Sequence, residues 1–101
     1  MNESVYTRKK IMPVIVRRGG VCVKRAAGPH SPKGLADVTA CYRGRTVVLE
    51  VKLPGRERTL TEIQRDRLDD WQAAGAEAEM VTTPEQVEAI LDRIDAEADG
   101  G

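Results

Sequence analysis

Glu50 and Lys52 stand two residues apart in the otherwise apolar run 46–53. So dense a run of Val and Leu is typical of a strand buried on both faces, where a charge is costly unless it is paired or coordinates a metal. Asp37 precedes this pair by only a short stretch of chain. Two carboxylates and a lysine that meet at a strand end could hold Mg²⁺ or Mn²⁺, which prefer oxygen ligands, and activate a bound water.

The elements that must position these residues follow from periodicity, caps and turn signals. We predict a first helix from Glu3 toward Gly19, with a kink or late start at Pro13, and then strands at 21–25, 36–42 and 46–53. A helix from Thr59 or Thr61 to Ala74, a strand at 78–82 and a last helix after Thr83 follow. The apolar stripes are Val5, Ile11, Met12, Ile15 and Val16 in the first helix, Leu60, Ile63, Leu68, Trp71 and Ala74 in the second, and Val87, Ile90, Leu91 and Ile94 in the last. This αβββαβα order favours an α/β domain with a mixed four-stranded sheet flanked by helices. We expect one domain over 1–96 and a flexible tail over 97–101.

The second and third strands are predicted to form a hairpin through Arg43-Gly44-Arg45. Counting back from this turn, Tyr42 pairs near Thr46, and Asp37 then falls near Val51. Alternate side chains of a strand share a face, so Asp37 would lie beside Glu50 and Lys52. The backbone carbonyl of Val51 could supply a further oxygen to the ion.

Four short segments give this chain a resemblance to a known nuclease family. They are Gly34-Leu35-Ala36-Asp37, Glu50-Val51-Lys52, Pro54-Gly55 and Gln64. In this order and spacing they resemble the VRR-NUC domain of the PD-(D/E)xK superfamily, in its small stand-alone phage and bacterial form. Ala36 departs from the family pattern, which has Pro before the Asp.

The resemblance implies a restriction-endonuclease-like core and a metal-dependent DNA endonuclease. By it, Asp37 and Glu50 bind Mg²⁺ or Mn²⁺, Lys52 is the catalytic lysine, Gln64 supports the site and Glu3 completes the metal shell. It also implies branched DNA, such as a four-way junction, as substrate. Cutting two strands of a junction requires two active sites, which a homodimer would provide.

The charge distribution agrees with a polyanionic partner. Residues 1–58 hold 13 basic and four acidic side chains, a surplus of nine, whereas residues 59–101 hold three basic and 12 acidic ones. A basic half next to an acidic half indicates contact with a polyanion such as nucleic acid. The basic side chains expected nearest the site, and so the ones to grip phosphates, are Lys24, Arg25, Lys33, Arg56 and Arg58.

Each candidate also has a purely structural interpretation. Glu50 and Lys52 could form a surface ion pair, Asp37 could begin a strand after a turn, and Glu3 could be a first-turn acid. Gln64 could complete a capping box with Thr61, and Arg56 and Arg58 could be ordinary loop charges. Two rival functions stay open: a non-catalytic DNA-binding module on this fold, and an interaction protein that uses its acidic half.

The remaining signals are weaker. Cys22 and Cys41 are too few for a disulfide framework, and we expect both to be buried as small apolar residues. A zinc site of these cysteines with His30 matches no usual spacing, and His30 is expected to be exposed. With neither a signal peptide nor an apolar run near about 18 residues, we expect a soluble intracellular protein with no membrane partner. The family resemblance implies the cytoplasm of a bacterial or phage-infected cell.

Overall fold

A computed structural model describes residues 1–26 and 34–100 of the chain. Its elements are α1 (Glu3–Tyr6), the π-helical η1 (Thr7–Ile11), α2 (Met12–Arg17), β1 (Val21–Lys24), β2 (Val38–Tyr42), β3 (Arg45–Val51), the 3₁₀ turn η2 (Glu57–Thr59), α3 (Glu62–Ala73), β4 (Glu77–Val81) and α4 (Pro84–Gly100). Lys33 and His30 lie outside the described residues.

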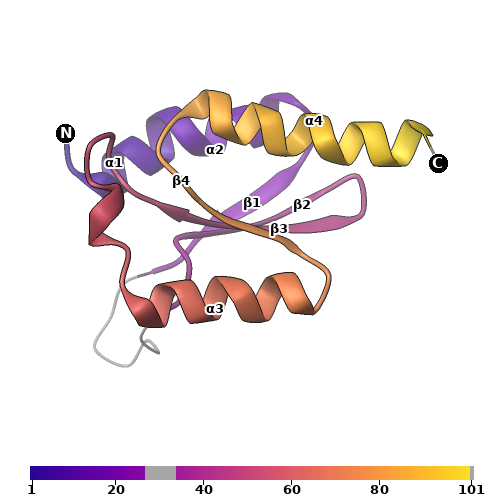
Figure 1. The fold of residues 1–101 in the computed structure, drawn as a ribbon. Helices are drawn as coiled ribbons and strands as arrows, with labels where there is room; N and C mark the ends of the chain where they lie inside the picture. Colours follow the sequence, from indigo (N-terminus) through magenta and orange to yellow (C-terminus); the bar gives the residue numbers. More distant parts are fainter. Residues whose placement is uncertain (27–33, 101) are drawn as a thin grey trace.

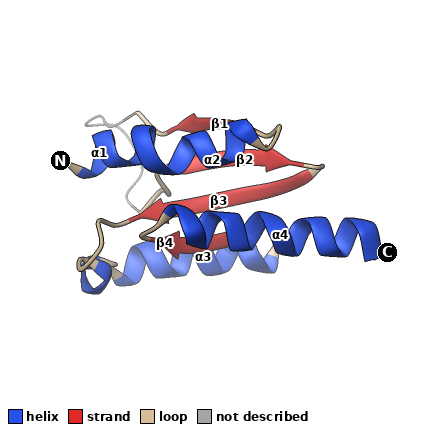
Figure 2. Cartoon of the chain, turned by 90° about the horizontal axis from the view of Figure 1, so that it is seen from above, coloured by secondary structure: helices blue, strands red, loops and turns tan. Residues whose placement is uncertain are grey.

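The four strands form one mixed sheet in the order β1-β2-β3-β4. β1 and β3 each pair antiparallel with β2, and β3 pairs parallel with β4 through the crossover helix α3. Helices α2 and α4 cover one face of the sheet and α3 the other (Figures 1 and 2). The predicted α/β class and mixed four-stranded sheet are therefore confirmed, and β3 is an inner strand.

The β2–β3 hairpin closes through a two-residue turn. Arg43 and Gly44 both have positive φ, 48° and 81°, the combination that a type I′ turn requires. Tyr42 consequently pairs with Arg45, one residue from the predicted partner Thr46. The same register pairs Val38 with Leu49, which keeps Asp37 next to the last residues of β3.

Alternation along β3 divides its side chains between two cores. Val47, Leu49 and Val51 are buried in the larger core with α2 and α4, whereas Val48 belongs to the smaller core under α3. Glu50 shares the α3 side with Val48, as predicted. The predicted stripe of α4 is also confirmed, since all four of its apolar residues are buried: Val87, Ile90, Leu91 and Ile94.

The first helix accommodates Pro13 by a π-helical turn. The Met12 N–H donates to the carbonyl of Thr7, five residues back, and Pro13 then sits in the first turn of α2. Because Pro13 has no N–H to donate to the previous turn of this continuous helix, the wider π-helical turn before it accommodates the ring. The extra residue in the turn also changes which side chains face the core: Val14 is buried, whereas Val16, which we expected in the apolar stripe, is 58% exposed.

Helix α3 differs from the prediction in what it buries. Thr61 rather than Thr59 is its N-cap, and of its predicted apolar stripe only Leu68 is buried within the helix. Ile63 is 49% exposed and Trp71 is 40% exposed. The reason is the position of α3, which packs against β3 and β4 rather than against β1 and β2 among the described residues (Figure 2).

Helix α4 continues to Gly100, past the point at which we expected a frayed tail. Arg45 pairs with Glu97 at 2.5 Å, and Arg43 pairs with Asp99 at 3.0 Å. These pairs join the hairpin to the last turns of the helix. They also mean that part of the charge asymmetry along the sequence cancels inside the fold, so fewer of the basic residues are available to an external partner than the sequence indicates.

Arg18 is the centre of the largest of these ion-pair groups. Its guanidinium reaches Glu88 at 2.5 Å, Asp92 at 2.9 Å and Asp95 at 2.7 Å, and it lies 5.8 Å from the centre of the Tyr42 ring. The hydrogen bond to Glu88 does most to raise the pKa of Arg18 above its ordinary value. This network fixes α2 against α4.

Replacing Arg18 by alanine should therefore lower the free energy of unfolding by about 1–2 kcal/mol, because several ion pairs are lost together. The loss should shrink at high salt, which screens such pairs. Urea unfolding at two salt concentrations measures it. Arg17→Ala is the matched control, since Arg17 is exposed and makes no ion pair with any residue in the described ranges; an equal loss in both variants would contradict the network's role.

Two further expectations concern the cysteines and membranes. Cys22 is half-buried, but Cys41 is exposed, so the prediction that both are buried is wrong for Cys41. The reason is again that α3 packs against β3 and β4 rather than against β2 in the part of the chain that the structure describes. Among the helices within residues 1–26 and 34–100, none combines the length and the apolar character that crossing a membrane requires.

Candidate functional site

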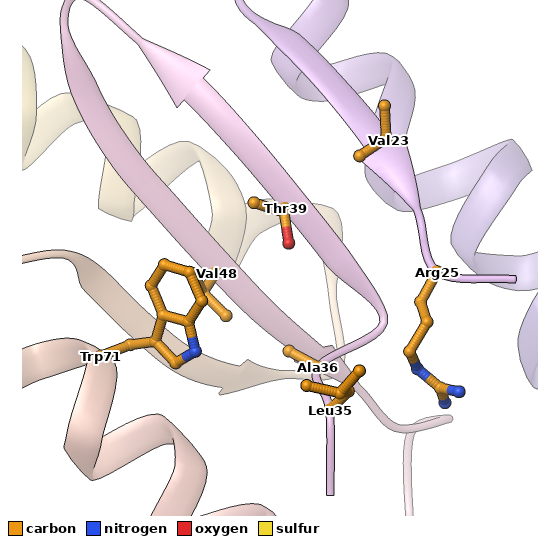
Figure 3. Close-up of a pocket in the computed structure, with 7 residues that line it drawn as sticks. All are labelled: Val23, Arg25, Leu35, Ala36, Thr39, Val48 and Trp71. Carbon is orange, nitrogen blue, oxygen red and sulfur yellow. The ribbon is translucent and has the colours of Figure 1, made fainter. Parts of the chain in front are cut away.

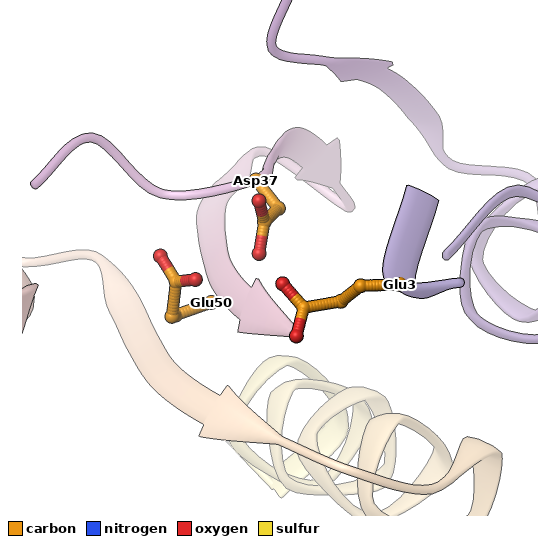
Figure 4. Close-up of side chains that lie close together, drawn as sticks. All are labelled: Glu3, Asp37 and Glu50. Carbon is orange, nitrogen blue, oxygen red and sulfur yellow. The ribbon is translucent and has the colours of Figure 1, made fainter. Parts of the chain in front are cut away.

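Three carboxylates converge at the end of the sheet where β3 ends and α1 begins. Glu3 comes from α1, Asp37 directly precedes β2 and Glu50 lies on β3. One oxygen from each lies within 4.8 Å of the other two. Figure 4 shows the three side chains pointing toward a common centre. We call these residues the acidic cluster.

Asp37 is held in place by the backbone of β3. The Val51 N–H donates to one Asp37 oxygen, Oδ2, at 2.8 Å. The other oxygen, Oδ1, lies 3.9 Å from the guanidinium of Arg25. The Asp37 carbonyl accepts from the Arg25 N–H at 2.7 Å, so the residue is fixed to both neighbouring strands. The carboxylate is thus oriented before any ligand arrives.

Glu50 and Lys52 are not a surface ion pair. Their side chains are 3% and 9% exposed, and Lys52 Nζ lies 3.7 Å from Glu50 Oε2. The other oxygen, Glu50 Oε1, is buried and has no hydrogen-bond partner among the described residues. Burial, followed by the close approach and negative charge of the Asp37 carboxylate, raises the pKa of Glu50 to about 8. Lys52 opposes this rise only in part.

Glu3 enters the cluster because α1 is anchored from two sides. Asn2 caps the helix by accepting a hydrogen bond from the Val5 N–H at 2.8 Å. One turn later, the Tyr6 hydroxyl donates to the Thr82 carbonyl at 2.6 Å, which joins α1 to the segment between β4 and α4. The position of Glu3 therefore depends on a contact with a residue 76 positions away in the sequence from Tyr6.

Tyr6→Phe should weaken Mn²⁺ binding about fivefold, because losing one hydrogen bond of about 1 kcal/mol frees α1 to shift Glu3. Isothermal titration calorimetry measures the affinity. If Tyr6 acts through Glu3, the same substitution placed in a Glu3→Gln background should cause no further loss. A full additional loss in that background would mean that Tyr6 acts by another route.

Two predicted site residues have other contacts. Gln64 Oε1 accepts from the Thr61 N–H at 3.0 Å, and Thr61 Oγ1 accepts from the Gln64 N–H at 3.1 Å, which completes the capping box. Only the amide nitrogen of Gln64 remains to support a site. Val51 contributes its N–H to Asp37, whereas a role for its carbonyl toward an ion remains a prediction.

The basic residues expected to hold phosphates differ in position. Lys24 and Arg25 line, together with Glu3 and Asp37, a hollow of about 310 Å³. Arg56 and Arg58 are exposed in and beside η2, at the same end of the molecule as the N-terminus (Figure 1). Positive side chains therefore flank the acidic cluster, as a site for an anionic substrate with a bridging cation would need.

The donor set fits a hard divalent cation. It offers carboxylate oxygens only, the ligands that Mg²⁺ and Mn²⁺ prefer. The buried, unpaired Glu50 Oε1 and the raised pKa of Glu50 indicate mutual repulsion that a cation would relieve. Glu3, Asp37 and Glu50 would hold the ion, and the ammonium of Lys52 lies 3.7 Å from Glu50.

Neither the role of Tyr6 nor the pairing of Arg25 with Asp37 was predicted. No local motif marks either contact, since each joins separate elements that meet only in the fold. A search for similar proteins found no match for this chain, whether among protein-family models, curated proteins or solved structures.

Proposed function

We propose that this chain is a divalent-metal-dependent endonuclease that hydrolyses phosphodiester bonds in DNA. The observation that carries the proposal is the meeting of Glu3, Asp37 and Glu50 beside the buried Lys52. Glu3 and Asp37 also line a hollow that is edged with basic residues. A structural ion pair needs neither three converging acids nor an open hollow. Asp37 and Glu50, with Glu3, would bind Mg²⁺ or Mn²⁺.

When bound, the cation would supply Lewis-acid polarisation of a phosphoryl oxygen and would lower the pKa of a coordinated water. Residues of the chain would orient the ligand oxygens, hold the attacking water and bind the phosphates. Asp37, fixed by the Val51 N–H, and the buried Glu50 orient the ligand oxygens. Lys52 Nζ lies 3.7 Å from Glu50 and would hold the attacking water and offset negative charge in the transition state. Lys24 and Arg25 would bind neighbouring phosphates.

The resemblance of Asp37, Glu50-Val51-Lys52 and the following helix to the VRR-NUC pattern supports the finer part of the proposal. We infer a restriction-endonuclease-like arrangement of the α/β core and branched DNA, such as a four-way junction, as the substrate. A homodimer would supply the two active sites that cutting two strands of a junction needs.

The test is a nicking assay on supercoiled DNA and on a synthetic four-way junction. With Mg²⁺ or Mn²⁺, the wild-type chain should cleave, and chelation of the metal should stop cleavage. Glu50→Gln should be inactive at every metal concentration tried. Cleavage that persists in Glu50→Gln would contradict the assigned site.

The same assay separates the proposal from its main alternative, a non-catalytic DNA-binding module. Salt-dependent DNA binding without cleavage in either metal would favour that module. A chain with no affinity for DNA would favour an interaction protein instead.

A further inference from the structure

The face of the sheet that α3 leaves open contains an apolar groove beside the acidic cluster. Its sides are Val23 of β1 and Trp71 of α3, and its floor includes Thr39 and Val48 (Figure 3). Val23 is 63% exposed and Trp71 is 40% exposed. The two side chains face one groove, which gives a ligand a concave apolar surface to bind.

The size of the groove limits its occupant. It holds about 230 Å³, below the range of about 300–1,000 Å³ that is common for whole small-molecule ligands. A single flat ring system suits that volume better than an extended ligand. The indole of Trp71 lies along one side, and an aromatic side chain in such a position offers a stacking surface for a base.

Arg25 connects this groove to the acidic cluster. Its side chain lines both the groove and the hollow that contains Glu3 and Asp37. Its only ion pair within the described residues is the long one to Asp37, at 3.9 Å, and its buried Nε has no hydrogen-bond partner there. A guanidinium with unused donors fits a phosphate oxygen.

We propose that the groove is a subsite for one unpaired nucleobase, whose backbone phosphate is held by Arg25 as the strand enters the acidic cluster. This inference rests on the proposed function for the identity of the strand. It adds a requirement to that function: the nucleotide next to the cleaved phosphate must be unstacked. Fully paired DNA would have to open at that position, whereas the end of a branch or a single strand would not.

Trp71 allows a direct test because it is the only tryptophan in the chain. Without metal, a short single-stranded oligodeoxythymidylate should quench Trp71 fluorescence. An abasic oligonucleotide with the same number of phosphates should not. Trp71→Ala should weaken binding of the oligodeoxythymidylate about tenfold and leave the affinity for the abasic chain unchanged, because stacking is lost and phosphate contacts are not.

Two further variants sharpen the test. Ile63→Ala removes an exposed apolar side chain from the same helix but outside the groove lining, so it should change neither affinity. Arg25→Ala should weaken both oligonucleotides and reduce the salt dependence of binding by about one phosphate contact. Circular dichroism confirms that each variant is folded.

Equal affinity for the two oligonucleotides, or an unchanged affinity in Trp71→Ala, would overturn the subsite. The subsite would also be overturned if Trp71 fluorescence, measured without oligonucleotide, changed with protein concentration. The groove would then be an interface between copies of the chain. The quenching experiment needs neither metal nor cleavage, so it tests the subsite separately from the proposed enzyme activity. Quenching of Trp71 without any hydrolysis would support the subsite and refute the enzyme. Hydrolysis that Trp71→Ala does not change, with no quenching, would support the enzyme and refute the subsite.

Discussion

Lys52→Met should reduce the rate of DNA cleavage roughly 10²–10³-fold while Mn²⁺ binding stays within a few-fold of wild type. Lys52 lies 3.7 Å from Glu50 but is not an oxygen ligand, so the carboxylates that would hold the ion are unchanged. In the proposed mechanism, the substitution removes the positive charge that would lie beside the attacking water and offset negative charge in the transition state. Methionine keeps most of the volume of the buried stem, which limits the cost to packing.

Single-turnover cleavage and calorimetric Mn²⁺ titration of the same protein separate these two effects. Lys9→Met is the matched control, since Lys9 lies exposed on η1 and its loss changes the net charge equally. It should cleave at close to the wild-type rate. A Lys52→Met variant that cleaves as fast as this control would remove Lys52 from the mechanism.

The second large effect concerns stability and pH. Because the pKa of Glu50 is raised from 4.5 to about 8, the folded chain binds this proton more tightly than the unfolded chain does. The resulting stabilisation is complete below about pH 4.5 and is lost as the pH rises through about 8. The metal-free wild-type chain should therefore melt at a lower temperature at about pH 9 than at about pH 5.

Glu50→Gln should abolish this loss, because glutamine cannot ionise beside Asp37. At about pH 9 the variant should melt on the order of 5 °C higher than metal-free wild type, although it no longer binds the cation. Mn²⁺ should raise the melting temperature of wild type and leave that of the variant unchanged. Thermal denaturation with and without Mn²⁺ at the two pH values measures all of these quantities.

The control for this prediction is Glu62→Gln, which neutralises an exposed glutamate in the first turn of α3. It should follow the wild-type pH dependence. If Glu50→Gln melted below wild type at about pH 9, the glutamate would be stabilised by Lys52 more than it is destabilised by burial and by Asp37.

Local signals predicted the elements that carry the site. The alternation in 46–53 placed Glu50 and Lys52 on one side of a buried strand, and the turn at 43–45 brought Asp37 to them. The predicted register was wrong by one residue, but Asp37 still lies beside the end of β3. It precedes β2 and accepts a hydrogen bond from the Val51 N–H there. The helix N-caps at Thr61 and Thr83 could also be predicted, because a capping box involves residues only three positions apart in the sequence.

Contacts between distant segments could not be predicted from the sequence. Nothing near Tyr6 in the sequence indicates the Thr82 carbonyl that anchors α1. The apolar spacing in α3 predicted burial of Trp71, but the spacing does not say how many strands the helix covers. The surplus of basic residues in 1–58 likewise does not predict that Arg18, Arg43 and Arg45 form ion pairs with acidic residues of α4.

The central claim, that the acidic cluster is a cation site, is tested most directly by a crystal structure of the chain soaked in Mn²⁺. We predict an anomalous peak at about 2.0–2.3 Å from carboxylate oxygens of Asp37 and Glu50, with Glu3 turned toward it. A well-ordered cluster with no peak, or Mn²⁺ bound only elsewhere, would contradict the claim.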